Sequence, residues 1–363
     1  MKQKIKFGAQ PFGMSLSEWE HALSQKYGKG RYHAEALFRH LHQSFDTHAS
    51  SIEEFQPALP LAEKIERDFP AQLPSLGRVV GEGGTRKFTL KLHDELLTES
   101  VLIPMSQWDT LCLSSQVGCQ RSCAFCETAR MGLVRNLDAG EIVAQWACAV
   151  RDFGVTPRNI VFMGMGEPFD NFEQVIRAVR VLSDPRGPGI PKRRICISTC
   201  GHVDGLQALG ESEQQFPEEA FRTLHLAVSV NASNDVLRNK LMPINRQWSL
   251  SALKQALLAL PQSKAKDALY FEYVVIPGVN SSVSDAEAFV EWLDGMGGKV
   301  NIIPYHPTGN TPWQAPDDET MDTFHSVIRA SGRECRTRKS KGKGIEAACG
   351  MLGKEGKSQR HQS

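Results

Sequence analysis

The sequence predicts an α/β protein built on a parallel β-sheet and preceded by a small helical module and a short antiparallel sheet. Three observations support this prediction. Apolar residues recur at helical spacing over about the first 70 residues, Phe88, Leu90 and Leu92 alternate with polar residues, and from Thr110 onward a strand, loop and helix pattern repeats six times. Strands that alternate with helices indicate a parallel sheet with right-handed crossovers.

Residues 1–75 are expected to form the helical module. Ser17 and Glu20 have the spacing of a capping box at the start of its first helix, and Pro74 follows its last helix. Residues 76–104 are expected to form a linker β-hairpin. Its alternating apolar positions are Phe88, Leu90 and Leu92.

Residues 105–350 are expected to form the main domain of six βα repeats, and residues 351–363 a basic, flexible tail. The candidate strands are residues 111–114, 160–163, 195–199, 224–230, 270–276 and 300–304. In barrels of this kind the chemistry takes place on the loops that follow the carboxyl ends of the strands. Functional residues should therefore come directly after these strands.

The composition of the 363-residue chain excludes several classes of protein. Hydrophobic residues make up 41% and charged residues 23%, which excludes disorder of the whole chain. Since there is no run of about 18 apolar residues and no apolar signal region after Met1, we expect a cytoplasmic protein with no membrane partner. We also expect the protein to be a monomer. In that reducing compartment nine cysteines indicate metal ligands or redox chemistry.

The charges nearly cancel, with 42 basic and 41 acidic residues, but they are unevenly distributed. The segment from Ser331 onward contains nine basic and three acidic residues, and a second basic cluster occupies residues 192–194. Such patches attract phosphate backbones, although a run of charge is as often a solvated surface.

The strongest local signal is a C-x-x-x-C-x-x-C motif formed by Cys119, Cys123 and Cys126. Three thiolates on a short loop can hold three irons of a 4Fe-4S cluster and leave the fourth iron open to another ligand. The alternative is a zinc site with a remote fourth ligand, but structural zinc sites usually contain paired C-x-x-C units, and no second unit is present. The spacing therefore favours the cluster.

Other candidate residues follow the expected strands. Gly166 and Glu167 come after the second strand, where a glycine allows close backbone approach and a carboxylate can accept from an ammonium group; the alternative is a tight turn. Ser198 and Ser229 end the third and fourth strands, although a lone serine there is more often a turn residue. Cys349 follows several lysines that would favour its thiolate, but a lone cysteine is usually a small buried hydrophobe.

Taken together, these motifs resemble those of the RNA adenine methyltransferases of the RlmN and Cfr type, which are radical S-adenosylmethionine enzymes. The resemblance covers nearly the whole chain. Besides the three cysteines it rests on residues 110–119, 162–168, 197–199, 241–245 and 347–350. It implies a partial (βα)6 barrel and, because Pro168 follows Glu167, it is closer to the RlmN branch, which methylates carbon 2 of adenine, than to the Cfr branch, which methylates carbon 8.

The resemblance also implies roles for single residues. Cys119, Cys123 and Cys126 would bind one 4Fe-4S cluster. Cys349 would carry the methyl group, Cys112 would resolve the protein–RNA adduct by forming a disulfide with Cys349, and Glu99 would accept a proton. The residues lining S-adenosylmethionine would be Gly166, Glu167, Ser198, Ser229, Val230, Asn231 and His306. Where this chain has Asn231 and His306 the family usually has His and Asn.

The implied reaction consumes two S-adenosylmethionine molecules per turnover and methylates ribosomal RNA, transfer RNA or both. It also requires an external electron donor such as flavodoxin or ferredoxin. Two alternatives remain open at this point: methylation of carbon 8, and a non-catalytic iron–sulfur protein that binds RNA.

Overall fold

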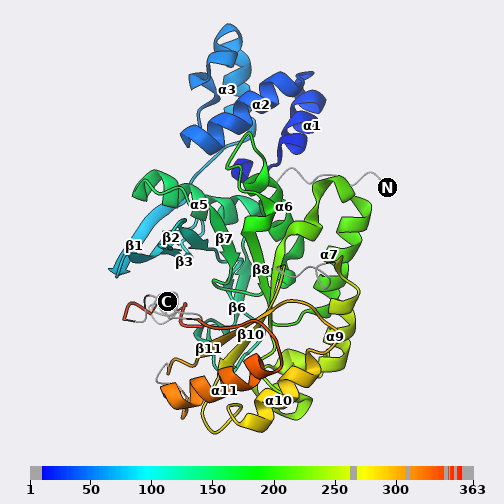
Figure 1. Cartoon of the computed structure of the whole chain (residues 1–363). Coiled ribbons are helices and arrows are strands. Elements are labelled where there is room, and N and C mark those ends of the chain that lie inside the picture. The colour runs from blue at the N-terminus through cyan, green and yellow to red at the C-terminus, as the bar shows by residue number, and fades with distance from the viewer. Residues whose placement is uncertain are drawn as a thin grey trace.

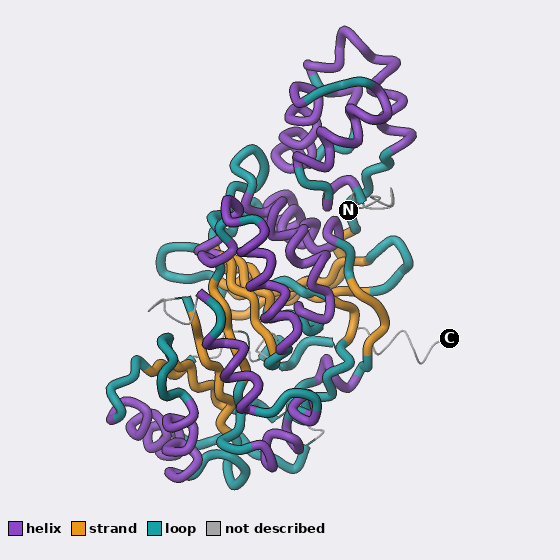
Figure 2. Tube along the Cα trace, turned by 90° about the vertical axis from the view of Figure 1, so that its right-hand side faces the viewer, coloured by secondary structure: helices purple, strands orange, loops and turns teal. Residues whose placement is uncertain are grey.

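The computed structural model describes residues 10–261, 268–307, 311–338, 342, 344–346 and 350–353. A ten-stranded sheet with its helices forms the main body, and the N-terminal helices stand at one end of it (Figure 1). The turned view in Figure 2 shows the same arrangement, with the helical module projecting beyond the rest of the chain. No helix in the described ranges is both long and apolar enough to cross a membrane.

Three α-helices form the N-terminal module: α1 (Leu16–Tyr27), α2 (Arg31–Arg39) and α3 (Leu59–Asp68). Short turns connect α2 to α3: η2 (His40–Ser44), η3 (Ala49–Ser51) and η4 (Glu53–Ala58). Helix α1 begins at a capping box in which Ser15 and Glu18 accept from each other's backbone amides. The prediction that Ser17 and Glu20 form this box is wrong. Both pairs have the required spacing, but only Ser15 precedes the first helical turn.

The antiparallel part of the sheet leads directly into the parallel part. Strands β1 (Ser75–Glu82), β2 (Thr85–Lys91) and β3 (Leu97–Ile103) pair antiparallel in sequence order, and β3 pairs antiparallel with β4 (Thr110–Cys112). The segment expected to be a linker hairpin therefore contains three strands and extends the main sheet.

Within the ten-stranded sheet every neighbouring pair from β4 to β12 is parallel. The strands after β4 are β7 (Asn159–Phe162), β8 (Ile195–Thr199), β9 (His225–Ser229), β10 (Leu269–Val275), β11 (Lys299–Pro304) and β12 (Cys335–Thr337). All six expected strands are present, with ends that differ by at most two residues. Strand β12 is additional, and at three residues it is too short for a periodic signal.

Helices lie between the parallel strands, as the alternating pattern predicts. They are α4 (Glu127–Arg130), α5 (Ala139–Phe153), α6 (Phe172–Ser183), α7 (Val203–Gln215), α8 (Asp235–Leu241), α9 (Leu250–Leu258), α10 (Val283–Trp292) and α11 (Asp318–Ala330). Because the outer strands β1 and β12 do not pair with each other, the sheet is open and the barrel is partial. The predicted fold class is confirmed.

A two-stranded ribbon carries the cysteine motif. Strands β5 (Gln116–Gly118) and β6 (Leu133–Asn136) pair antiparallel, and the motif lies in the loop between them. Gly118 has φ +80°, and a Cβ there would lie 1.9 Å from the Gly132 carbonyl oxygen. This position therefore requires glycine, because the two sides of the loop approach too closely for a side chain.

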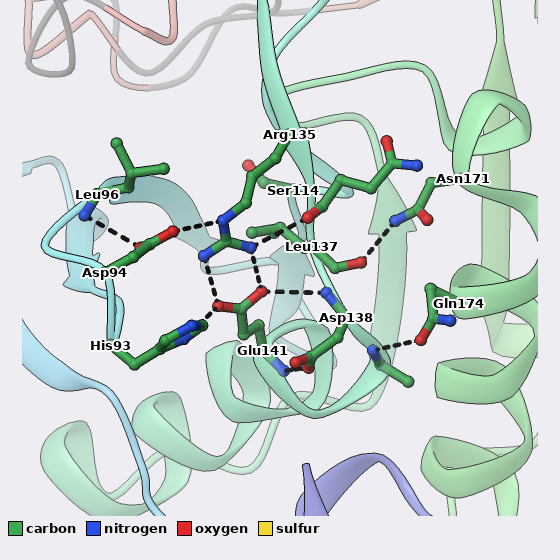
Figure 3. Close-up of polar contacts among 12 residues, drawn as sticks. His93, Asp94, Leu96, Ser114, Arg135, Leu137, Asp138, Glu141, Asn171 and Gln174 are labelled. Carbon is green, nitrogen blue, oxygen red and sulfur yellow. Dashed lines mark hydrogen bonds and ion pairs between the residues drawn. The ribbon is translucent and has the colours of Figure 1, made fainter. Parts of the chain in front are cut away.

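The ribbon is fixed to α5 by a cluster that we call the Arg135 clamp, shown in Figure 3. It consists of His93, Asp94, Arg135, Asp138 and Glu141. The guanidinium of Arg135 donates two hydrogen bonds of 2.7 Å to the two oxygens of Glu141 and one of 2.6 Å to Asp94. Glu141 also accepts from the Asp138 amide, and its side chain is 3% exposed. Since each carboxylate oxygen of Glu141 has donors, the clamp is a saturated internal ion pair.

The chain returns to the cysteine loop near its end. The Glu127 amide donates to the Gly350 carbonyl at 2.8 Å, and the Thr128 hydroxyl donates to the Leu352 carbonyl at 2.8 Å. Met351 and Leu352 are buried. The first residues of the expected flexible tail are therefore packed in the body, and residues 354–363 lie outside the described ranges.

Candidate active site

The carboxyl ends of the parallel strands surround a cavity of about 1160 Å³, including its open mouth. Met163 and Gly164 contribute from the end of β7, Ser198 from β8, and Ser229 from β9. The cysteine loop and residues 350–352 line the same cavity. The structure thus brings together sequence segments that are up to about 230 residues apart.

All three motif cysteines line this cavity, and each is close enough to influence the ionisation of another. Burial raises the pKa of Cys119 to about 12, and burial also raises the pKa of Cys123 and of Cys126. The protein environment alone therefore favours neutral thiols. A bound metal centre reverses that preference, because it stabilises thiolate.

The three cysteines are the candidate ligands of the cluster. In the described part of the chain no group of three or more His, Cys, Asp or Glu side chains is placed to hold one metal ion. Three separate thiols around one cavity suit an iron–sulfur cluster, in which each thiolate binds a different iron.

Gly166 and Glu167 lie beside the cysteine loop. Gly166 has φ +101°, and a Cβ there would lie 2.6 Å from the Gln116 side chain, so glycine permits this approach. Glu167 is 4% exposed and accepts from the backbone amides of Phe169 at 3.1 Å and Cys200 at 2.7 Å. Burial raises its pKa, while those amide donors act in the opposite direction. This carboxylate is held rigidly at the cavity wall.

Of the other residues expected around the cofactor, four line the cavity and one does not. Ser198, Ser229, Asn231 and His306 line the cavity, whereas Val230 is fully buried and is not part of its lining. Asn231 has φ +57°, and its amide oxygen accepts from the Val274 amide at 2.8 Å. The Asn231 side chain therefore braces β9 against β10.

Arg238 on α8 is a residue that the sequence reasoning missed. It is fully buried and donates to the backbone carbonyls of Cys200, Ser229 and Val230 at 2.7 to 3.1 Å. It thereby ties the end of β8 to the end of β9. Its charge also opposes the rise in the pKa of Cys123. No motif marks it, because a lone arginine in an amphipathic helix usually faces solvent.

Two of the three expected catalytic residues, Glu99 and Cys112, lie beneath residues 350–353. Glu99 on β3 is 1% exposed, and one of its oxygens accepts from the Gly353 amide at 3.0 Å while the other lies 3.5 Å from the Lys87 ammonium. Cys112 on β4 is 7% exposed and belongs to one apolar cluster with Met131, Met165 and Leu352.

The third, Cys349, lies outside the described residues, although its neighbour Gly350 is placed against Phe125 and Cys126. No disulfide joins the cysteines within the described ranges. The expected Cys112–Cys349 disulfide involves Cys349 and so lies outside the described residues.

Comparison with known proteins places the chain among sequences of similar length. Residues 113–293 match the Radical SAM superfamily. The chain is 40% identical over 340 residues to the probable dual-specificity RNA methyltransferase RlmN 1 of Protochlamydia amoebophila, covering 92% of this chain and 91% of the relative. It is 38% identical to the dual-specificity RNA methyltransferase RlmN of Geobacter sulfurreducens, with coverage of 94% and 91%.

A solved structure has the same fold. The crystal structure of a radical SAM methyltransferase from Sphaerobacter thermophilus superposes with a TM-score of 0.83 at 35% identity, covering 94% of this chain and 98% of the other. The similarity therefore includes both the helical module and the main body.

Proposed function

The chain belongs to the RlmN family of radical SAM RNA methyltransferases, and from that premise we propose that it transfers a methyl group from S-adenosylmethionine to carbon 2 of an adenosine in RNA. The observation that carries the proposal is the convergence on one cavity of three cysteines, the Gly166–Glu167 turn and residues 350–352. The relatives are named RlmN, and the resemblance associates the RlmN branch with carbon 2 rather than carbon 8.

The family implies a 4Fe-4S cluster and S-adenosylmethionine, and the residues present fit both. Cys119, Cys123 and Cys126 would hold the cluster, and Glu167 would accept from the ammonium group of the cofactor. When bound, the two groups supply the radical chemistry that an electron-poor ring carbon requires. Glu167 suits its role because both of its oxygens are already oriented by backbone amides.

We propose that Cys349 carries the methyl group and that Glu99 and Cys112 complete the reaction. Gly353 donates to Glu99, and Leu352 packs in one cluster with Cys112, so the segment that follows Cys349 contacts the surroundings of both residues. Glu99 would accept a proton from the adduct. Cys112 would then attack the Cys349 sulfur, which releases the product and leaves a disulfide for an external thiol to reduce.

The finer parts of the proposal concern partners. We infer that ribosomal RNA, transfer RNA or both are substrates, that residues 1–75 contact the RNA, that two S-adenosylmethionine molecules are used per turnover, and that a flavodoxin or ferredoxin supplies the electron to a monomeric enzyme. The module's position at one end of the body favours a contact with RNA beyond the target nucleotide (Figure 1).

Mass spectrometry of nucleosides from ribosomal and transfer RNA tests the proposed function. RNA from cells lacking the gene should lose 2-methyladenosine, and purified cluster-loaded protein should restore it. Restoration by wild-type protein but not by the Cys349→Ala variant would support the methyl-cysteine route. The appearance of 8-methyladenosine would contradict the assignment of the carbon, and unchanged nucleosides would contradict the activity.

A further inference from the structure

A second cavity opens at the opposite end of the parallel strands. It has a volume of about 1770 Å³ including open solvent, and it is lined by residues at or near the start of five strands. These residues are Thr110, Asn159, Cys196, His225 and Tyr270. The active-site cavity is lined by residues at the ends of the same sheet, so the two cavities enter the barrel from opposite rims.

The two cavities meet inside the barrel, because five residues line both of them. They are Met163, Glu272, Ile303, His306 and Arg338. A group that enters from the amino ends of the strands can therefore contact side chains that also border the cysteine site.

Glu272 on β10 has an unusual environment within this passage. It is 4% exposed. Its Oε1 atom accepts a hydrogen bond from the side-chain amide of Asn301 at 2.8 Å and one from the Arg338 guanidinium at 3.5 Å. Its Oε2 atom has no hydrogen-bond partner in the described structure. A buried carboxylate oxygen without a donor is costly, and a ligand that supplies an N–H group would remove that cost.

The Glu272 and Arg338 pair presents an acceptor beside a donor. Adenine carries the complementary pair on its Watson–Crick edge, where the 6-amino group donates and the neighbouring ring nitrogen N1 accepts. Resting on the proposed function, we propose that the target adenosine enters from the amino ends of the strands and that Glu272 Oε2 accepts a hydrogen bond from its 6-amino group. Glu272 is thus a specificity residue for the base.

The mouth of the second cavity suits the RNA that flanks the target. Arg193 and Arg194 line it, and the Arg194 Nη1 atom is buried without a hydrogen-bond partner in the described structure. The guanidinium groups of Arg158 and Arg194 lie 4.6 and 4.8 Å from the ring centroid of Trp108, which is 37% exposed. Cations next to an exposed aromatic ring are the groups that bind the backbone and bases of single-stranded RNA.

The test uses an RNA hairpin containing the target adenosine, located by mass spectrometry of nuclease fragments of the RNA, and a second hairpin in which purine riboside, which lacks the 6-amino group, replaces it. Binding of both to anaerobic, cluster-loaded protein is measured by fluorescence anisotropy. Wild-type protein should bind the adenosine hairpin about tenfold more tightly, as expected for one hydrogen bond to a charged group. Glu272→Met should bind the two hairpins equally, and Glu272→Gln, which keeps an acceptor oxygen, should retain part of the difference.

Glu141→Gln is the matched control, because Glu141 is an equally buried carboxylate of the Arg135 clamp and lines neither cavity. It should keep the tenfold preference. Equal binding of the two hairpins by wild-type protein would overturn the inference whether or not any variant folds, and so would a preference that survives in Glu272→Met. Methylation of the adenosine hairpin by wild-type protein is measured separately, so that failure of the proposed function and failure of this inference are distinguishable.

Discussion

The Arg135 clamp and the barrel passage each contain a buried glutamate, and the two glutamates differ in how their oxygens are used. In the clamp both oxygens of Glu141 accept from Arg135, with the Asp138 amide as a further donor (Figure 3). In the passage Glu272 accepts on one oxygen only, within the described part of the chain. Glu141 lines only a separate pocket beside His93 and Lys91, whereas Glu272 lines both the active-site cavity and the second cavity. In this pair the saturated glutamate ties the ribbon to α5, and the glutamate with an unsatisfied oxygen is the one that we assign to ligand binding.

The largest expected effect on activity comes from replacing the three motif cysteines, which, like Glu272, line a cavity. Replacing Cys119, Cys123 and Cys126 together by Ala should remove the iron and abolish methylation, while the protein remains folded. Iron and sulfide analysis of anaerobically prepared protein checks this, with about four irons expected per wild-type chain. Cys335→Ala, a buried cysteine on β12, is the control that should keep its iron. Stoichiometric zinc in wild-type protein made with ample iron would contradict the cluster.

The clamp should show the opposite behaviour, a loss of stability. Arg135→Ala leaves Glu141 buried without its guanidinium partner and should lower the free energy of unfolding by about 3 kcal/mol. Urea denaturation measures the change. Arg151→Ala, which breaks an exposed pair with its neighbour Asp152, should cost less than about 0.5 kcal/mol. If both variants lowered the free energy of unfolding by the same amount, the buried Arg135–Glu141 pair would stabilise the protein no more than a surface pair does.

His42 in the helical module sharpens the comparison, because it is buried and unsatisfied without lining any described cavity. Its ring is 1% exposed, lies between Phe12 and Phe38, and has no hydrogen-bond partner in the described structure. Burial lowers its pKa from 6.5 to about 3. The unfolded chain therefore binds a proton below pH 6.5 that the folded chain does not, and stability falls as the pH drops from about 6.5 toward 3.

Between pH 6.5 and pH 5 this difference amounts to about 2 kcal/mol. His42→Phe should remove that part of the acid sensitivity. Urea denaturation of both proteins at the two pH values measures it, and NMR titration of the ring gives an independent check. A ring that titrates near pH 6.5 in the folded protein would refute the assignment.

The smallest expected effect concerns the mouth of the passage. Replacing Arg193 and Arg194 by Ala should weaken RNA binding at low salt and reduce the slope of log affinity against log salt by about 0.7 for each lost phosphate contact. Arg222→Ala removes an exposed arginine that is paired with Glu213 and should leave the slope unchanged. Equal slopes for the double variant and wild-type protein would place the RNA elsewhere.

Much of the fold could be predicted from the sequence because its signals are periodic and local. Val175, Ile176, Val179 and Leu182 are spaced along one face of α6, and all are buried. The cysteine motif needs no tertiary information, since its spacing alone brings three thiols onto one loop. The α1 capping box was misplaced because Ser15 and Ser17 carry the same local signal.

The parts that could not be predicted depend on contacts between distant segments. Arg238 binds carbonyls on two strands, and nothing in its own helix marks it. Glu272 did have a signal, since it is the charged residue in the strand Leu269–Val275, whose other residues are apolar or aromatic. A charge in such a strand requires a partner or a ligand, and the sequence does not reveal which.

The return of residues 350–353 to the cysteine loop has a consequence for biosynthesis. Leu352 contacts Thr128 across 224 residues of sequence, and Gly353 contacts Glu99 across 254. The ribosome therefore synthesises the cysteine loop long before the segment that covers it. Until residues 350–353 have been made, this segment cannot cover the cysteine loop.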